Sequence, residues 1–438
     1  MEEISLRSYF TLSLSFGFLS LLTPCVFPLI PLTVSFFSKN SDKKLASILF
    51  EAFIFMFGVI LTFSLLGVLI SILFGASGLN KLSTNPYMNL TLFFIFTAFA
   101  LNLFGVFEIY VSSDILNSIN SKKTSNQILQ NLLIAFLFTL TTFTCTMPFL
   151  GTLLVSAAKG EWFYPFFGML GFSFSFSLPF AILAVFPKLL SRLPKSGSWL
   201  NSFKVCLGFL ELGAGLKFLS NADMIWKFNF LSREIFLTVW TSIFFALSLY
   251  LFGFYYFSHE KKAEKGKSLT RILFAILSLS FTLYFYSGIS GKNLGEWEAF
   301  FPPPSSALNS SSSKEIKDDL VWLSSLEEAK LVSAQKNLPI FIEFTGYTCT
   351  NCRWMEQNMF TVLDVKESLT KFILVKLYTD GEEAVHEKNQ KYEEDKFGTI
   401  ALPLYAIVDK NEKIISQFMG MTRDREEFKK FLSTPIPK

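Results

Sequence analysis

One stretch of the sequence decides the fold of the C-terminal part of the chain: Thr345-Gly346-Tyr347-Thr348-Cys349-Thr350-Asn351-Cys352-Arg353-Trp354-Met355-Glu356. This stretch follows an apolar run at residues 338–344, and the run predicts a buried strand. The stretch itself is expected to begin a helix. Two cysteines separated by two residues at a strand-to-helix junction are typical of a redox-active pair. Cys349 is expected near the helix N-terminus, where the positive end of the helix dipole favours the thiolate. The motif therefore predicts thiol–disulfide exchange, with Cys349 as the attacking thiol and Cys352 as the resolving thiol.

A zinc site is the main alternative for a pair of cysteines with this spacing. Such a site needs two further ligands from elsewhere in the chain. The chain has only two histidines, His259 and His386, and His259 is expected in a cytoplasmic loop. The sequence therefore favours the redox interpretation, and we expect no metal and no other cofactor.

The segments around the motif alternate between helix and strand patterns. After residue 318 we expect a helix at about 326–336, the strand at 340–344 and the helix that begins at Cys349. A strand near 372–378, a polar helix near 382–397, strands at 404–408 and 413–418 and a final helix from about 423 follow. This is the element order of a thioredoxin fold, so residues 318–438 are predicted to form an α/β thioredoxin-like domain.

Three further residues are candidates for the redox site. Glu343 lies six residues before Cys349 on the predicted strand, and a carboxyl buried there can exchange a proton with Cys352. Glu356, one helical turn after Cys352, is a second candidate, and a solvated charge is the alternative for each. Pro403 precedes a predicted strand, and we expect a cis bond there that leaves a backbone edge beside Cys349 for an extended substrate. An ordinary trans proline is the alternative.

The composition before residue 290 is that of a membrane protein. The chain has 438 residues, of which 51% are hydrophobic and 17% charged, against about 25% charged in soluble domains. Eight windows are long and apolar enough to span a bilayer. They cover roughly residues 10–37, 45–74, 88–110, 128–155, 163–186, 200–219, 235–257 and 272–289. Residues 1–289 are thus predicted to form a helical membrane domain, and the net charge of +4 is too small to indicate nucleic-acid binding.

The basic residues of the loops predict how this domain is oriented. Alternate loops carry most of them: Lys39, Lys43, Lys44, Lys122, Lys123, Lys188, Arg192, Lys195, Lys261, Lys262, Lys265, Lys267 and Arg271. By the positive-inside rule these loops are cytoplasmic, so both termini lie outside the inner membrane. Residues 290–317 are rich in proline and serine and predict a linker to an extracytoplasmic C-terminal domain, in a compartment where disulfides form.

Two membrane segments share a Cys-x-x-Pro pattern: Thr23-Pro24-Cys25-Val26-Phe27-Pro28 and Phe143-Thr144-Cys145-Thr146-Met147-Pro148. Prolines interrupt helices, and such breaks are tolerated at membrane depth where protein or a water-filled cavity surrounds them. Matching breaks in two halves of three helices each indicate an inverted repeat around a central site. We therefore expect Cys25 and Cys145 to meet near the midplane and to form a disulfide, with Pro24, Pro28 and Pro148 shaping the site. The alternative is that each cysteine is a small packing residue, which we also expect for Cys206.

Together these motifs resemble the DsbD family of membrane thiol:disulfide interchange proteins, across nearly the whole chain. The two membrane motifs resemble its DsbD/CcdA electron-conducting domain, and the Cys349–Cys352 segment resembles its C-terminal thioredoxin-like domain. The resemblance implies that electrons pass from cytoplasmic thioredoxin through Cys25 and Cys145 to the C-terminal pair and on to extracytoplasmic protein disulfides, including those of cytochrome c maturation. It also implies that the active-site acids are Glu343 and Glu356. The chain starts almost directly with its first apolar segment, so the N-terminal alpha domain of the family is expected to be absent and the terminal acceptor stays open.

Two other functions fit parts of the pattern. A quinone-coupled thiol oxidase would run the same chemistry in the opposite direction, although the membrane cysteines do not form loop Cys-x-x-Cys pairs. A solute transporter with a regulatory thioredoxin-like domain would also use broken helices. In that protein Cys25 and Cys145 would be dispensable. Glu211, in the sixth apolar window, is either functional or paired with Lys204 or Lys217, and no catalytic role is assigned to it.

Overall fold

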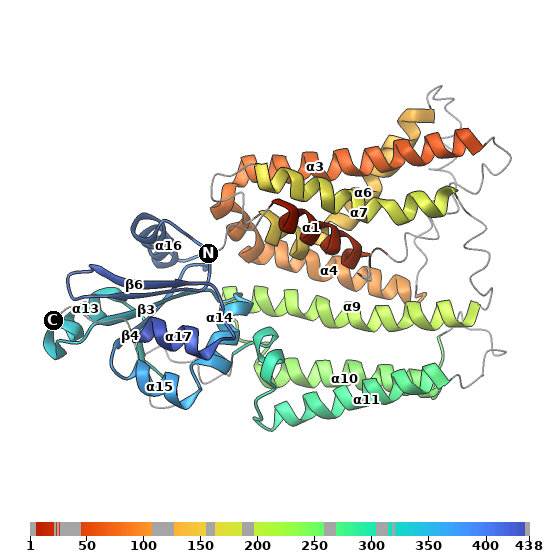
Figure 1. Cartoon of the computed structure of the whole chain (residues 1–438). Helices are drawn as coiled ribbons and strands as arrows, with labels where there is room; N and C mark the ends of the chain where they lie inside the picture. Colours follow the sequence, from red (N-terminus) through yellow and green to blue (C-terminus); the bar gives the residue numbers. More distant parts are fainter. Residues whose placement is uncertain are drawn as a thin grey trace. The chain divides into compact units, whose positions relative to one another are not determined.

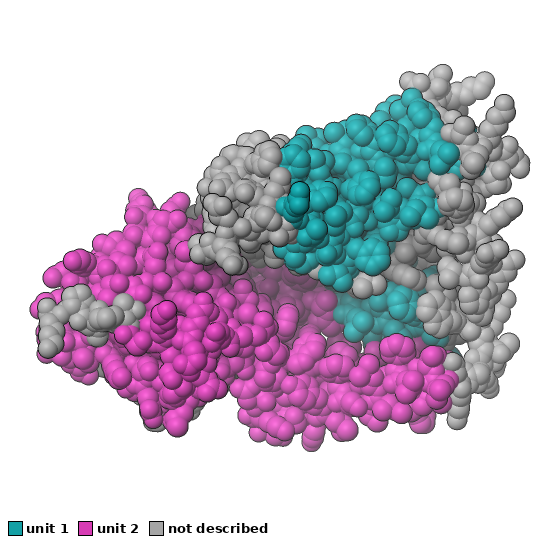
Figure 2. All heavy atoms as spheres, in the orientation of Figure 1, with its two compact units in different colours: residues 1–79, 95–212, 255–266 teal, residues 80–94, 213–254, 267–438 magenta. Residues whose placement is uncertain are grey.

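The structure is a computed structural model of the whole chain (Figure 1). It describes residues 6–21, 23, 26, 45–106, 127–154, 163–185, 197–257, 269–303, 314–317 and 320–433. These residues form two compact units, coloured separately in Figure 2. Unit 1 comprises residues 1–79, 95–212 and 255–266, and unit 2 comprises residues 80–94, 213–254 and 267–438.

In the described part of the chain, eight helices precede residue 290. They are α1 (Leu6–Ser20), α3 (Leu45–Thr84), α4 (Pro86–Leu103), α6 (Gln127–Leu154), α7 (Phe163–Val185), α9 (Gly197–Trp226), α10 (Arg233–Phe252) and α11 (Leu269–Ile289). Each lies where the hydropathy pattern predicts an apolar segment. Among the described residues, four stretches are long and apolar enough to cross a membrane: Ser47–Gly67, Pro86–Leu103, Arg233–Phe252 and Leu269–Ile289. The helical, membrane-type N-terminal region is thus confirmed, and the number of spans stays a prediction.

Phenylalanines fill the core of unit 1. Phe63 of α3 meets Phe172 and Phe176 of α7 edge to face, with ring centroids 5.7 and 5.5 Å apart. Helix α1 lies close against α7, because a Cβ on Gly17 would come within 2.4 Å of the Phe172 carbonyl oxygen. Small residues permit this approach between helix backbones in a membrane.

The expected helix break at the second Cys-x-x-Pro motif is not observed. Helix α6 runs without interruption from Gln127 to Leu154, through Cys145 and Pro148. Prolines inside membrane helices are tolerated when neighbouring groups or local adjustments satisfy the freed carbonyl. Helix α1 ends at Ser20, ahead of the first motif, and Pro24, Cys25 and Pro28 lie outside the described residues.

The C-terminal part is built on one mixed sheet with strand order β1-β2-β4-β3-β5-β6. Its strands are β1 (Lys314–Lys317), β2 (Leu320–Leu323), β3 (Ile340–Thr345), β4 (Ile373–Tyr378), β5 (Leu404–Val408) and β6 (Ile414–Met419). Strand β3 runs parallel to β4 and antiparallel to β5. It is buried along its whole length because helices cover both faces of the sheet.

The helices of this domain divide between the two faces. Residues of α14 (Thr350–Trp354), the π-helical turn η4 (Met355–Met359), α15 (Leu363–Leu369) and α17 (Arg425–Leu432) join one core cluster. Residues of α13 (Leu326–Lys336) and α16 (Ala384–Phe397) join the other. Side chains alternate along a strand, so Glu343 points to the same face as Phe341, which is the face covered by α14. The predicted α/β fold is confirmed.

Much of the expected linker is folded. Residues Gly295–Phe300 form the short helix η3, and Leu294 and Phe301 are buried in a cluster with Trp240 and Phe285. At the other end, Lys314–Lys317 pairs with β2. Residues 304–313, between these two segments, lie outside the described residues.

Candidate active site

The cysteine pair lies where β3 gives way to α14. Cys349 caps α14: its Sγ accepts a hydrogen bond from the Cys352 backbone N–H at 3.1 Å. A disulfide joins the two residues, whose Cα atoms are 5.3 Å apart. Cys349 is half-buried, whereas Cys352 is fully buried. Only the first sulfur is therefore placed to meet another protein's thiol or disulfide.

Asp380 holds the loop that leads into Cys349. Its carboxylate accepts hydrogen bonds from the backbone N–H of Tyr347 at 2.7 Å and of Thr348 at 3.0 Å, and from the Thr348 hydroxyl at 3.2 Å. A Cβ on Gly346 would lie 2.7 Å from the same carboxylate, so the close approach requires glycine. Burial raises the pKa of Asp380, and these hydrogen bonds oppose that shift.

Sequence reasoning missed Asp380, although a signal for it exists. Asp380 follows strand β4 almost directly, as the cysteine loop follows β3. The carboxyl ends of neighbouring parallel strands lie at the same sheet edge, so side chains after β3 and β4 are expected to meet.

Tyr347 links this loop to the buried His386. Its ring stacks on Tyr378, with centroids 4.2 Å apart, and its hydroxyl oxygen lies 3.5 Å from Nε2 of His386. Burial raises the pKa of Tyr347 and lowers that of His386. Both side chains are therefore neutral at physiological pH, and they pack as an aromatic wall beside the cysteine loop.

The two predicted acids belong to one buried cluster of charges. The register of the sheet places Glu343 of β3 opposite Lys376 of β4. The Lys376 Nζ lies 3.9 Å from Glu343 Oε2 and 3.3 Å from Glu356 Oε1. Arg353 adds a hydrogen-bonded ion pair to Glu356 at 2.7 Å. Since Glu343 and Glu356 are 0% and 3% exposed, the alternative of solvated charges is wrong for both.

This cluster is electrically balanced, with two carboxylates and two cations. Burial alone would lower the pKa of Arg353, but the charges of Glu356 and Glu343 and the interaction with Tyr378 together outweigh burial. The pKa is raised, so the guanidinium stays charged. Burial raises the pKa of Tyr405 well above its ordinary value, and the charges of Glu343 and Glu356 add to that shift. Buried charges are tolerated when they are paired in this way.

The cluster reaches the surface on one side. A small pocket is lined by Glu356 and Lys376 together with Leu320, Trp322, Phe360, Thr361 and Lys366. Lys376 also lies over the Trp322 ring, 5.1 Å from its centroid. Glu356 thus lines the pocket directly, and Glu343 is separated from it by the Lys376 side chain.

The structure also describes the predicted proline and part of the membrane motifs. The Leu402–Pro403 bond is cis, as predicted, and the Pro403 carbonyl accepts a hydrogen bond from the Gly420 N–H at 2.8 Å. The side chains of Cys145 and Pro148 lie outside the described residues, as do Pro24, Cys25 and Pro28. Neighbours of the two cysteines are buried in unit 1: Val26, Thr142 and Thr146.

Two residues of α9 that the sequence left open are described. Cys206 is partly exposed, and Glu211 is fully buried. In the described part of the chain neither carboxylate oxygen of Glu211 has a hydrogen-bond partner, so the alternative of a hydrogen-bonded pair with Lys204 or Lys217 is not observed there.

Known proteins resemble both parts of the chain. Residues 6–222 match the family model described as cytochrome C biogenesis protein transmembrane domain, and residues 321–410 match a thioredoxin-like model. The thiol:disulfide interchange protein DsbD of Vibrio cholerae is 25% identical over 81% of this chain and 55% of its own length. The DsbD of Pseudoalteromonas atlantica is 23% identical over 90% of this chain and 62% of its own length.

The matched regions span a little over half the length of these relatives. The membrane-domain match contains both Cys-x-x-Pro motifs, and the thioredoxin-like match contains Cys349, Cys352, Glu343 and Glu356. The chain is therefore an inner-membrane protein that is similar, in both of its parts, to the DsbD family of thiol:disulfide interchange proteins.

Proposed function

We propose that this protein is a membrane protein-disulfide reductase. Electrons enter from cytoplasmic thioredoxin, pass through Cys25 and Cys145, reduce the Cys349–Cys352 disulfide and leave to extracytoplasmic protein disulfides. The observation that carries the proposal is the geometry of the C-terminal pair, with a half-buried Cys349 at a helix N-terminus and a fully buried Cys352. Its setting behind a DsbD-type membrane domain supports an electron source within the same chain.

Each transfer is a pair of thiol–disulfide exchanges. A thiolate of the membrane pair attacks the Cys349–Cys352 disulfide, and its partner thiol resolves the mixed disulfide, leaving both C-terminal thiols reduced. The Cys349 thiolate then attacks a client disulfide, and the Cys352 thiolate displaces the client. Two electrons and two protons move to the client in each cycle.

The buried cluster supplies a place for the proton of Cys352. Cys352 is fully buried, so its thiol needs an internal acceptor when it attacks the mixed disulfide. Glu343 points to the sheet face covered by α14, which carries Cys352. We assign Glu343 the role of proton acceptor, with Lys376 and Glu356 linking it to the surface pocket.

The proposed direction of electron flow is downhill. Thioredoxin has a potential of about −270 mV, and a strong extracytoplasmic oxidant such as DsbA has one of about −120 mV. The difference of about 150 mV corresponds to about 7 kcal/mol for two electrons. A reductase that opposes such an oxidant in the same compartment would serve proteins that need free thiols, and apocytochrome c is one such client class.

The test is thiol trapping of the C-terminal pair in cells. Cys25→Ser and Cys145→Ser are each expected to leave Cys349 and Cys352 fully oxidised, whereas the matched variant Cys206→Ser keeps them as reduced as in the wild type. Depletion of cytoplasmic thioredoxin is expected to have the same effect as Cys25→Ser. A reduced C-terminal pair in both membrane-cysteine variants would refute the relay and favour a transporter or an oxidase.

A further inference from the structure

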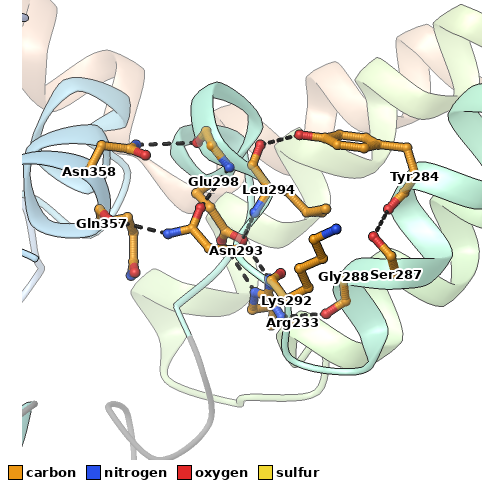
Figure 3. Close-up of polar contacts among 11 residues, drawn as sticks. Arg233, Tyr284, Ser287, Gly288, Lys292, Asn293, Leu294, Glu298, Gln357 and Asn358 are labelled. Carbon is orange, nitrogen blue, oxygen red and sulfur yellow. Dashed lines mark hydrogen bonds and ion pairs between the residues drawn. The ribbon is translucent and has the colours of Figure 1, made fainter.

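The segment after α11 is fixed to the helical part of unit 2 by a buried ion pair (Figure 3). Arg233, at the start of α10, places its Nη2 2.6 Å from Glu298 Oε1, and both side chains are less than a tenth exposed. Arg233 also donates to the Gly288 carbonyl at 2.9 Å, and Glu298 accepts from the Leu294 N–H at 2.9 Å. These bonds tie residues 288–298 to the first turn of α10.

Apolar contacts complete this anchor. Leu294 is fully buried, and a Cβ on Gly288 would lie 2.4 Å from its side chain. Phe301 packs against Trp240 and Phe285, with ring centroids 5.6 and 6.0 Å away. Residues 288–301 are therefore held against α10 and α11 by buried contacts.

The other side of the same segment contacts the thioredoxin-like domain directly after Cys352 (Figure 3). The Asn358 side chain donates to the Gly295 carbonyl at 3.2 Å, and the Asn293 side chain donates to the Gln357 carbonyl at 3.3 Å. Ala299 lies in the same apolar cluster as Trp354. These contacts fall on α14 and η4, the helical turns that carry the redox pair.

Two ion pairs add to the contact. Glu296 pairs with Arg423 at 2.9 Å, and the Arg423 guanidinium lies 5.5 Å from the Trp354 ring centroid. Lys227, in the turn between α9 and α10, pairs with Glu383 at 2.5 Å and lies 6.0 Å from the Tyr347 ring centroid. Tyr347 precedes Cys349, so contacts lie on both flanks of the cysteine pair.

The anchor and the contact differ in strength. The Arg233–Glu298 pair is buried, whereas the side chains of Glu296 and Arg423 are 61% and 64% exposed and those of Lys227 and Glu383 are 46% and 57% exposed. Exposed ion pairs contribute little and are screened by salt. A rigid platform that holds its partner mainly by exposed polar bonds, with Ala299 as its buried apolar contact, suits a contact that forms and releases.

We propose that Lys227, Asn293, Gly295, Glu296 and Ala299 form a docking seat that reversibly binds this chain's own thioredoxin-like domain. When docked, the domain has both flanks of Cys349 covered, and when released it offers them to a client disulfide. The occupant is residues 320–433 of the same chain. The purpose of the seat rests on the proposed function, because a domain that serves two redox partners must present one site to each in turn.

The test measures docking of the thioredoxin-like domain by cross-linking, without any redox step. Full-length protein in native membranes carries the photoreactive residue p-benzoylphenylalanine in place of Gln357, whose backbone makes the contact. We expect an intramolecular cross-link to the 293–299 peptide, identified by mass spectrometry. Glu296→Arg and Arg423→Glu should each lower its yield by about three- to tenfold, since each replaces an exposed attraction by a repulsion. The double swap should restore it.

A matched control uses an ion pair of similar exposure within the thioredoxin-like domain. Lys388→Glu combined with Glu327→Lys reverses a pair 2.7 Å apart and should leave the cross-link unchanged. A second charge swap, Lys227→Glu with Glu383→Lys, should likewise restore the cross-link yield that each single variant lowers. It tests the contact on the Tyr347 side of the cysteine pair. Absence of the cross-link in the wild type, or equal yields in single and double variants at both flanks, would overturn the docking seat. Neither result depends on electron transfer, which the Cys25→Ser variant tests separately.

Discussion

Two clusters of buried charge in unit 2 differ in how their cations and carboxylates are arranged. Arg233 and Glu298 form a closed pair, in which the carboxylate also accepts a backbone N–H and the guanidinium also donates to a carbonyl. In the four-membered cluster beside the redox pair, Lys376 is shared between two carboxylates at 3.9 and 3.3 Å. The first arrangement pairs one cation with one carboxylate, whereas in the second one cation lies between two carboxylates.

The difference separates a structural role from a chemical one. The closed pair anchors the segment beneath the docking seat, so its loss should affect folding. The shared lysine lies between the face of the sheet below α14 and a surface pocket, so changes there should affect proton transfer. The following predictions test this separation.

The largest expected effect is a loss of folding stability in the Arg233→Met variant. Removing one partner of a buried pair leaves the other charge uncompensated, which costs about 3–5 kcal/mol of unfolding free energy. Thermal unfolding of the full chain in nanodiscs should show a clear loss for unit 2, while the pH dependence of exchange by Cys349 stays as in the wild type.

The double variant Arg233→Met with Glu298→Leu is the control, because it removes both charges and should recover most of the stability. If Arg233→Met alone were as stable as the wild type, the pair would not anchor the segment. An altered pH profile of thiol exchange in this variant would remove the distinction between the two clusters.

A buried carboxyl outside both clusters sharpens the comparison, because no cation pairs with it in the described part of the chain. Glu393 of α16 is fully buried, and in the described part of the chain its carboxylate oxygens have no hydrogen-bond partner. Burial raises its pKa to about 9 from 4.5. The folded state therefore keeps a proton that the unfolded state loses, and the resulting stabilisation is present below pH 4.5 and lost as the pH rises toward 9.

Glu393→Gln should remove this contribution to the pH dependence of the unfolding free energy. In the wild type the group contributes a decrease of about 1.4 kcal/mol per pH unit between pH 5 and pH 8, or about 3 kcal/mol in two units. Chemical unfolding at pH 5, 6, 7 and 8 measures both slopes, and the variant should be the more stable protein at pH 8. Identical slopes would show that Glu393 is solvated or paired.

The sequence was most informative where structure is local. The cysteine pair, the strand before it and the helix after it are adjacent in the chain, and their arrangement follows from the motif. Burial of Glu343 followed from its apolar neighbours Ile342 and Phe344. The spacing of one helical turn from Cys352 indicated Glu356, which is buried in the structure, and its role in the redox site stays a prediction.

The partners of these acids depend on tertiary structure. Lys376 meets Glu343 because β4 lies beside β3 in the sheet, and no local pattern gives that strand order. The segment after α11 was expected to be a linker because of its prolines and serines. Its apolar residues Leu294 and Phe301 instead bury themselves against α10 and α11, and the pairing of Glu298 with Arg233 spans 65 positions.

The smallest predicted effect concerns the cluster in which Lys376 lies between Glu343 and Glu356. It distinguishes a loss of exchange rate from a loss of stability. Glu343→Gln keeps the shape of the side chain, and Lys376 retains Glu356 at 3.3 Å. Stability should therefore change little, but loss of the proton acceptor should slow resolution by Cys352 by about 100-fold, equivalent to about 2.7 kcal/mol. Stopped-flow exchange between the full chain and a disulfide peptide, from pH 6 to pH 9, measures the rate.

Glu393→Gln serves as the matched control, since it removes a buried carboxyl of the same domain on the other sheet face. The slowing should shrink as rising pH deprotonates Cys352 without help, and an equal loss at every pH would instead indicate a structural role for Glu343.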